Sequence, residues 1–107
     1  MKHVTDYELM LEVMAKKPEA MHEWAMRLMD AGREFEAANW LRQSADLGWI
    51  ESVYEMGNCY YAGFGVEEDW AMAFFYYERA AATGHPDALN NLADMYLNGE
   101  HVEINEV

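Results

Sequence analysis

Apolar residues recur every three to four positions along nearly the whole chain, which predicts amphipathic α-helices. Turn residues divide this pattern into six segments, at about 5–17, 18–32, 33–47, 50–62, 70–83 and 86–98. The alternating polar and apolar runs typical of strands do not occur in the sequence. Because the connections are short, consecutive helices are expected to pack antiparallel.

Several residues mark where the helices begin and end. Thr5 or Asp6 can cap the first helix, and Asp69 can cap the fifth. We expect Lys16 and Lys17 to lie in the last turn of the first helix, where cations suit the helix dipole. Pro18 should then stop the first helix and open the second.

The second half of the chain repeats itself at a spacing of 36 residues. A shift of this length superimposes small residues on small ones and large apolar residues on large ones: Ala37/Ala73, Trp40/Tyr76, Ala45/Ala81, Gly48/Gly84, Ser52/Ala88, Met56/Leu92, Gly57/Ala93, Tyr60/Tyr96, Gly63/Gly99 and Val66/Val102. Such self-similarity is typical of stacked repeats, in which each unit buries its apolar face against the next. Gly57 and Ala93 lie within helices, so we expect close helix–helix approach at both positions.

These repeats resemble the Sel1-like repeat family, a relative of the tetratricopeptide repeat. The resemblance lies in Gly63-Phe-Gly65-Val66 followed by Asp69 and a helix with Ala73, Tyr76 and Tyr77, then Ala80, Ala81, Gly84 and His85. It implies an all-α fold, an α/α solenoid in which antiparallel helical hairpins form a right-handed superhelix of about 2.5 repeats.

The resemblance also suggests how this single domain of 107 residues is organised. The expected parts are an N-terminal packing helix (1–17), a tetratricopeptide-like hairpin (18–48), one Sel1-like repeat (49–84), a partial repeat (85–103) and a tail (104–107). The last turn reads Gly99-Glu100-His101 and lacks the second glycine of the preceding repeat.

Charge is distributed unevenly along the chain. Residues up to Arg42 include eight acids and six bases (net −2), whereas Gln43 onward includes twelve acids and one base, Arg79 (net −11). A field of this sign repels nucleic acid and anionic lipid and attracts basic partners. With no export or membrane-spanning signal and a single cysteine, Cys59, the sequence predicts a cytoplasmic protein.

Candidate catalytic chemistry is weak. The glycines at 63 and 65 lack the lysine of a phosphate loop and precede three acids, and the four histidines show no metal-ligand spacing. Cys59 aligns with Met95 and is interpreted as a buried apolar residue. Secreted relatives rich in paired cysteines have reported affinity for β-lactams, but this chain has no cysteine pair. The sequence therefore predicts no enzymatic activity, no metal and no cofactor.

The resemblance implies instead a protein-interaction module or adaptor of bacterial origin. In tetratricopeptide-like solenoids the first helices of successive units line a concave groove that binds extended peptides. The corresponding positions here are His22, Met26, Met29, Tyr54, Asn58, Tyr61, Asn90, Asp94 and Leu97. With Asp94 and no lysine among them, these residues favour a basic or neutral peptide.

Two alternatives stay open. The chain could be an acidic inhibitor, such as an immunity protein that neutralises a basic toxin or nuclease through an acidic flank formed by Glu67, Glu68 and Asp69. The sixth helix, which no second helix follows, could be covered by the tail through Val102 and Ile104, by a second copy in a homodimer, or by another partner.

Overall fold

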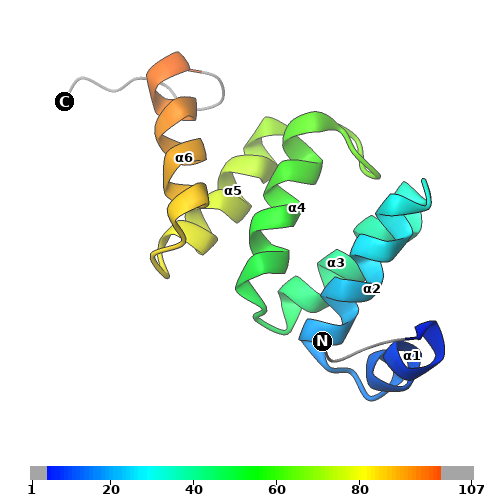
Figure 1. Ribbon diagram of the computed structural model, residues 1–107. Coiled ribbons are helices and arrows are strands. Elements are labelled where there is room, and N and C mark those ends of the chain that lie inside the picture. The colour runs from blue at the N-terminus through cyan, green and yellow to red at the C-terminus, as the bar shows by residue number, and fades with distance from the viewer. Residues whose placement is uncertain (1–4, 100–107) are drawn as a thin grey trace.

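The computed structural model describes residues 5–99, which form six α-helices and, within that range, no strand (Figure 1). The helices are α1 (Asp6–Met14), α2 (Pro18–Asp30), α3 (Glu34–Asp46), α4 (Ile50–Ala62), α5 (Trp70–Ala81) and α6 (Pro86–Asn98). Each helix packs mainly against its neighbours in sequence. The result is an elongated stack of 53 × 26 × 20 Å, which confirms the predicted helical solenoid.

Three clusters of buried side chains follow one another along the stack. The first lies between α1 and α2, the second spans α2 to α5 and reaches Ala88, and the third joins α4, α5 and α6. Trp24 and Trp40 contact both the first and the second cluster, and Tyr54 and Tyr60 contact both the second and the third. The hairpins therefore share one continuous apolar seam, as the repeat pattern predicts.

The first helix ends earlier than predicted. It stops at Met14, and Lys16 takes a left-handed conformation with φ +61°, so the expectation that Lys16 and Lys17 lie in its last turn is wrong. The amide of Lys16 donates to the Val13 carbonyl and that of Lys17 to the Glu12 carbonyl, which is the hydrogen-bond pattern of a Schellman turn. Pro18 keeps Lys17 out of the helix, because the residue before a proline avoids the helical conformation, and Lys17 is extended with φ −85° and ψ 119°.

The loop between α4 and α5 is held tightly against its surroundings. Asp69 accepts a hydrogen bond from the Met72 amide at 3.1 Å and caps α5, as predicted. Gly65 has φ +75° and lies so close to the backbone carbonyl of Glu34 that a side chain there would clash with it. Residues 63–69 are thereby fixed against α3.

Gly57 and its counterpart Ala93 lie in different surroundings. A methyl group on Gly57 would lie 2.6 Å from the ring of Tyr77 in α5, which confirms the predicted close approach. Ala93 is exposed, so the same expectation is wrong there. The reason is that no second helix follows α6 within the described residues.

Candidate functional site

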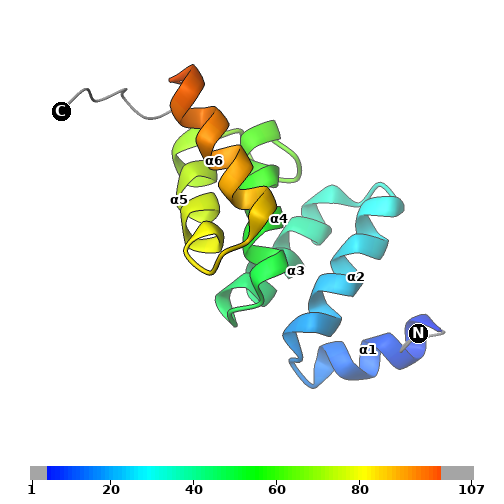
Figure 2. The same ribbon diagram turned by 60° about the vertical axis from the view of Figure 1, so that its left-hand side comes forward.

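The first helices of the hairpins, α2, α4 and α6, lie along one side of the stack, and α3 and α5 lie behind them (Figures 1 and 2). A hollow of about 220 Å³ opens between α4 and α6, with α5 behind it. Its lining residues are Asn58, Tyr61, Tyr77, Asn91, Asp94 and Met95. We call this hollow the α4–α6 groove.

Polar side chains from three helices meet in the α4–α6 groove. The Tyr77 hydroxyl donates to Oδ1 of Asn58 at 2.5 Å, and the Asn91 amide donates to the Tyr54 hydroxyl at 3.2 Å. Burial raises the pKa of Tyr77, so this hydroxyl keeps its proton at neutral pH. Asp94 is exposed, and no Lys or Arg is among the described residues that line the groove. The groove thus offers amide groups and one carboxylate to a ligand.

His85 joins the two repeats beside this groove. Its Nδ1 accepts a hydrogen bond from the Ala88 amide at 3.1 Å and caps α6, so its Nε2–H must be the group that donates to Glu51 at 3.2 Å. The ring also stacks on Tyr54, with centroids 4.6 Å apart. Sequence reasoning missed this role of His85, because histidine is not among the residues that helix N-caps favour.

At the other end of the row, His22 on α2 contacts α4. Its Nδ1 lies 2.7 Å from the Ser52 hydroxyl, which in turn donates to Ser44 at the end of α3. Ser44 and Ser52 are both fully buried, and every buried side-chain polar atom of the described residues has a partner. Two buried serines at a helix–helix contact thus hold the partly exposed His22.

The structure brings some of the predicted groove residues together and leaves others apart. Asn58, Tyr61 and Asp94 line the α4–α6 groove. Met26 and Met29 are partly buried against the central core, and Asn90 and Leu97 are exposed on α6 without lining a described hollow. Sequence reasoning missed Asn91 and Tyr77 as lining residues, because Tyr77 is almost fully buried and Asn91 follows the predicted Asn90 by one position.

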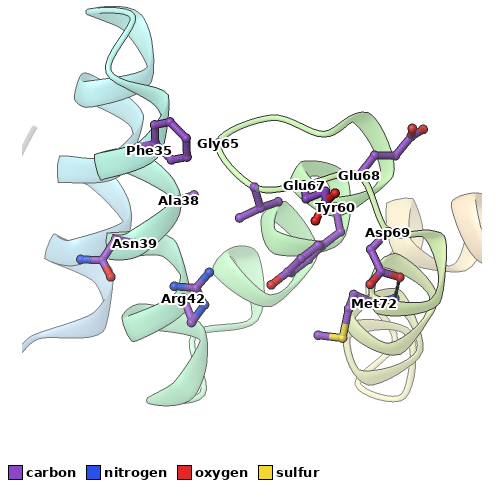
Figure 3. A pocket seen from close by; sticks show the side chains of 11 residues that line it. Phe35, Ala38, Asn39, Arg42, Tyr60, Gly65, Glu67, Glu68, Asp69 and Met72 are labelled. Atoms are coloured by element: carbon purple, nitrogen blue, oxygen red, sulfur yellow. Dashed lines mark hydrogen bonds between the residues drawn. The ribbon is translucent and has the colours of Figure 1, made fainter.

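A second, larger hollow of about 500 Å³ lies between α3 and the loop 63–69 (Figure 3). It is lined on the α3 side by Phe35, Ala38, Asn39 and Arg42, and on the other side by Tyr60, residues 65–69 and Met72. Figure 3 shows Glu68 pointing away from this hollow. Glu67, Glu68 and Asp69 are all exposed, but Asp69 is already engaged as the cap of α5.

Two observations on residues 5–99 bear on metal and catalytic chemistry. No group of three or more His, Cys, Asp or Glu side chains in that range could hold a metal ion. Burial raises the pKa of Cys59 to about 12, so its sulfur is a thiol at neutral pH and a poor nucleophile. None of the helices in the same range has the length and apolar character needed to cross a bilayer.

Comparison with known proteins identifies the repeats. The Sel1 repeat profile matches residues 18–49, 50–85 and 86–107, which include α2 to α6. The chain belongs to the Sel1 repeat family. Sel1 repeats generally act as protein–protein interaction modules and are typically non-enzymatic scaffolds.

Two solved Sel1-type structures are similar to this one. A protective antigen present in uropathogenic Escherichia coli strains, with an SLR fold, superimposes with a TM-score of 0.91 at 29% identity over 97% of this chain and 23% of its own. A Sel1 repeat protein from Oxalobacter formigenes superimposes with a TM-score of 0.78 at 31% identity over 87% of this chain and 73% of its own.

Among curated proteins, chitin synthase regulatory factor 2 of Schizosaccharomyces pombe is 33% identical over 66 residues. That match covers 62% of this chain and 13% of the yeast protein. The chain therefore spans only a small part of the yeast factor and about a quarter of the E. coli antigen.

Proposed function

We propose that this chain is a non-enzymatic adaptor that docks an extended protein segment, basic or neutral, along α2, α4 and α6. We call the side of the stack formed by these three helices the docking face. The observation on which this rests is the α4–α6 groove, where two amide side chains, two tyrosines and a carboxylate surround one hollow. Asparagine side chains can pair with both the N–H and the C=O of an extended backbone. Tyrosines add contact area at low entropic cost.

The charge of the surroundings selects among segments. Asp94 is the only ionisable carboxylate among the described residues of this groove, and the chain from Gln43 onward has twelve acids against one base. This field favours approach of a basic segment and disfavours nucleic acid and anionic membranes. A cytoplasmic location and a bacterial source are part of the proposal, supported by the unpaired Cys59 and by the bacterial origin of both similar structures.

Peptide display tests the proposal. Random peptides displayed on phage are selected on the immobilised protein, and the affinity of a selected basic peptide is compared between wild type and Asp94→Asn. Exposed charge pairs contribute about 1 kcal/mol or less, so a loss of up to about fivefold is expected. Glu78→Gln on α5 removes the same charge from an exposed site outside the groove and serves as the control.

Tyr61→Ala removes contact area from the same groove and should weaken the peptide further. Circular dichroism establishes that each variant is folded. Equal binding by wild type, Asp94→Asn and Tyr61→Ala would contradict docking in the groove.

The hollow beside the loop 63–69 favours a second candidate, an acidic inhibitor of a basic protein. Phe35 is 82% exposed at its rim, and Glu67 lines the opposite side of the same hollow. An exposed aromatic ring next to carboxylates suits an Arg or Lys side chain of a partner. Binding that weakens by orders of magnitude with salt and requires Glu67 and Glu68 would favour this candidate over peptide docking.

Self-association through α6 stays a prediction. Leu89, Tyr96 and Leu97 of α6 are 48%, 45% and 80% exposed, so this helix presents apolar surface. The residues proposed to fold back over it, Val102 and Ile104, lie outside the described part of the chain, as does most of the turn that starts at Gly99. Light scattering across a concentration series measures whether two copies associate.

A further inference from the structure

A chain of hydrogen bonds connects His22 on the docking face to the backbone of α2 through two buried serines. The Ser44 hydroxyl lies 2.7 Å from the Pro18 carbonyl oxygen, the Ser52 hydroxyl 2.7 Å from the Ser44 hydroxyl, and Nδ1 of His22 2.7 Å from the Ser52 hydroxyl. Each hydrogen bond joins a different pair of helices, so the network fixes the position of the His22 ring.

The number of protons available in this hydrogen-bond network fixes the direction of each of its hydrogen bonds. A carbonyl oxygen can only accept, so the single proton of Ser44 goes to Pro18. Ser44 must then accept from Ser52, which uses the single proton of Ser52. Ser52 has no proton left for His22, and Nδ1 of the ring must therefore be the donor. A neutral His22 is thus held in the Nδ1–H tautomer, with an unprotonated Nε2.

The second ring nitrogen, Nε2, is open to a ligand. No described residue is a hydrogen-bond partner of Nε2, yet no buried side-chain nitrogen or oxygen of the described residues lacks one. It follows that Nε2 reaches solvent, on a ring that is partly exposed. Its lone pair is a preoriented hydrogen-bond acceptor, because the bond at Nδ1 prevents the ring from turning or changing tautomer.

Among the described residues, the charged groups that act on this ring are carboxylates. They are Glu55 and Glu51 of α4 and Glu19 of α2 itself. Burial nevertheless lowers the pKa of His22 below its ordinary value, since desolvation outweighs the attraction of the three acids. The ring is therefore neutral at pH 7, and a neutral acceptor among carboxylates favours a positively charged donor.

We propose that His22 is a specificity-determining residue of the docking face: its Nε2 accepts a hydrogen bond from an Arg or Lys side chain of the docked segment, and protonation of the ring releases that side chain. This inference rests on the proposed function, and it assigns the basic residue to a place. The cation lies between α2 and α4, near Glu51 and Glu55, while the adjoining backbone extends toward the α4–α6 groove.

The tautomer is measured first, without any ligand. Long-range proton–nitrogen correlation spectra of protein labelled at histidine distinguish a protonated from an unprotonated ring nitrogen. We expect His22 at pH 7.5 to show a protonated Nδ1 and an unprotonated Nε2. The opposite tautomer, or a rapidly exchanging mixture, would overturn the inference whatever the protein binds.

The ligand is tested with a peptide, acetyl-Gly-Gly-Arg-Gly-Gly-amide, and with its norleucine analogue, which has no side-chain donor. We expect the arginine peptide to shift the His22 ring signals saturably and to lower the pKa of His22, because it binds only the neutral ring. Below that pKa its apparent Kd should rise about tenfold per pH unit. The norleucine peptide should leave the pKa unchanged.

His22→Asn separates this role from a structural one. Its amide can still donate to Ser52 from the place of Nδ1, but it has no atom at the place of Nε2. We expect a folded variant that has lost the response to arginine. Arginine binding that persists in His22→Asn, or that leaves the His22 signals of wild type unmoved, overturns the inference even if a selected peptide docks in the α4–α6 groove. A groove that binds no peptide, beside a His22 that responds, would instead count against the proposed function alone.

Discussion

Replacing Gly57 by alanine tests the packing between the two helices of the central repeat. The added methyl carbon would lie 2.6 Å from both Cδ1 and Cε1 of Tyr77 and 3.3 Å from its Cγ. Ordinary carbon contacts are about 3.5–4.0 Å, so something must move. Tyr77 is 2% exposed and its hydroxyl is hydrogen-bonded to Asn58, which leaves the ring little freedom to turn.

Two opposing effects decide the sign of the change. Alanine is favoured over glycine in a helix interior by about 1 kcal/mol. Overpacking a filled core costs about 1–3 kcal/mol, and displacement of the Tyr77 ring would break a hydrogen bond that contributes about 1 kcal/mol more. We therefore expect Gly57→Ala to lower the free energy of unfolding by about 1–3 kcal/mol.

Urea unfolding followed by circular dichroism and by tryptophan fluorescence measures this change. Ala93→Gly is the matched control, because Ala93 is the counterpart of Gly57 36 residues later and is exposed. Ala93→Gly should report helix propensity alone and lower the free energy of unfolding by about 1 kcal/mol. In a Tyr77→Leu background the cost of Gly57→Ala should largely disappear. A Gly57→Ala variant as stable as wild type, or more stable, would refute the reasoning.

Three further predictions concern stability. Lys16→Gly should raise the free energy of unfolding by about 0.5–1 kcal/mol in the same urea assay, because glycine adopts the left-handed conformation of Lys16 without strain. A lower free energy of unfolding would contradict the left-handed turn. Gly65→Val should lower the free energy of unfolding by more than Gly57→Ala does, by about 3 kcal/mol or above, because the left-handed Gly65 has the Glu34 carbonyl where a side chain would lie. A smaller decrease would show that the loop 63–69 is not fixed against α3. Because burial raises the pKa of Cys59 to about 12 from 9.0, the unfolded thiol ionises first, and stability should fall as pH rises above 9. Cys59→Ala should remove the part of this pH dependence that precedes tyrosine ionisation. Native protein at pH 8 should also react with iodoacetamide far more slowly than unfolded protein. Equal rates would mean that the native protein has an accessible thiolate.

The fold was accessible from the sequence because its local signals agree with its repeat. The bounds of α4 and α6 follow from Gly63, Pro86 and Gly99, and Asp69 caps α5 as its position suggests. The end of α1 was placed too late, since a non-glycine residue in a left-handed turn has no sequence signature. Lys16 is such a residue.

The docking face was only partly accessible. The positions predicted from related solenoids include Asn58, Tyr61 and Asp94, which do line one groove. They do not include Asn91, whose contact with Tyr54 joins positions 37 apart, one more than the repeat. On a helix one position is a turn of about 100°, which separates a groove residue from an exposed one. Periodicity alone cannot resolve that difference.

The network around His22 had no sequence signal at all. Ser52 aligns with Ala88, so it was interpreted simply as a small residue at a helix contact. Its bonds to Ser44 and His22 depend on how α2, α3 and α4 cross, which is set by the side chains between them. Such polar contacts between helices are visible only in the folded structure.

Nuclear magnetic resonance titration with a peptide selected by display tests the docking face most directly. The side-chain amide signals of Asn58 and Asn91 report on the α4–α6 groove, and the backbone amides of Glu67 and Glu68 report on the hollow beside α3. Docking along α2, α4 and α6 predicts saturable shifts of both asparagine side chains, with the two glutamate amides unmoved. Shifts confined to Glu67 and Glu68 would contradict it.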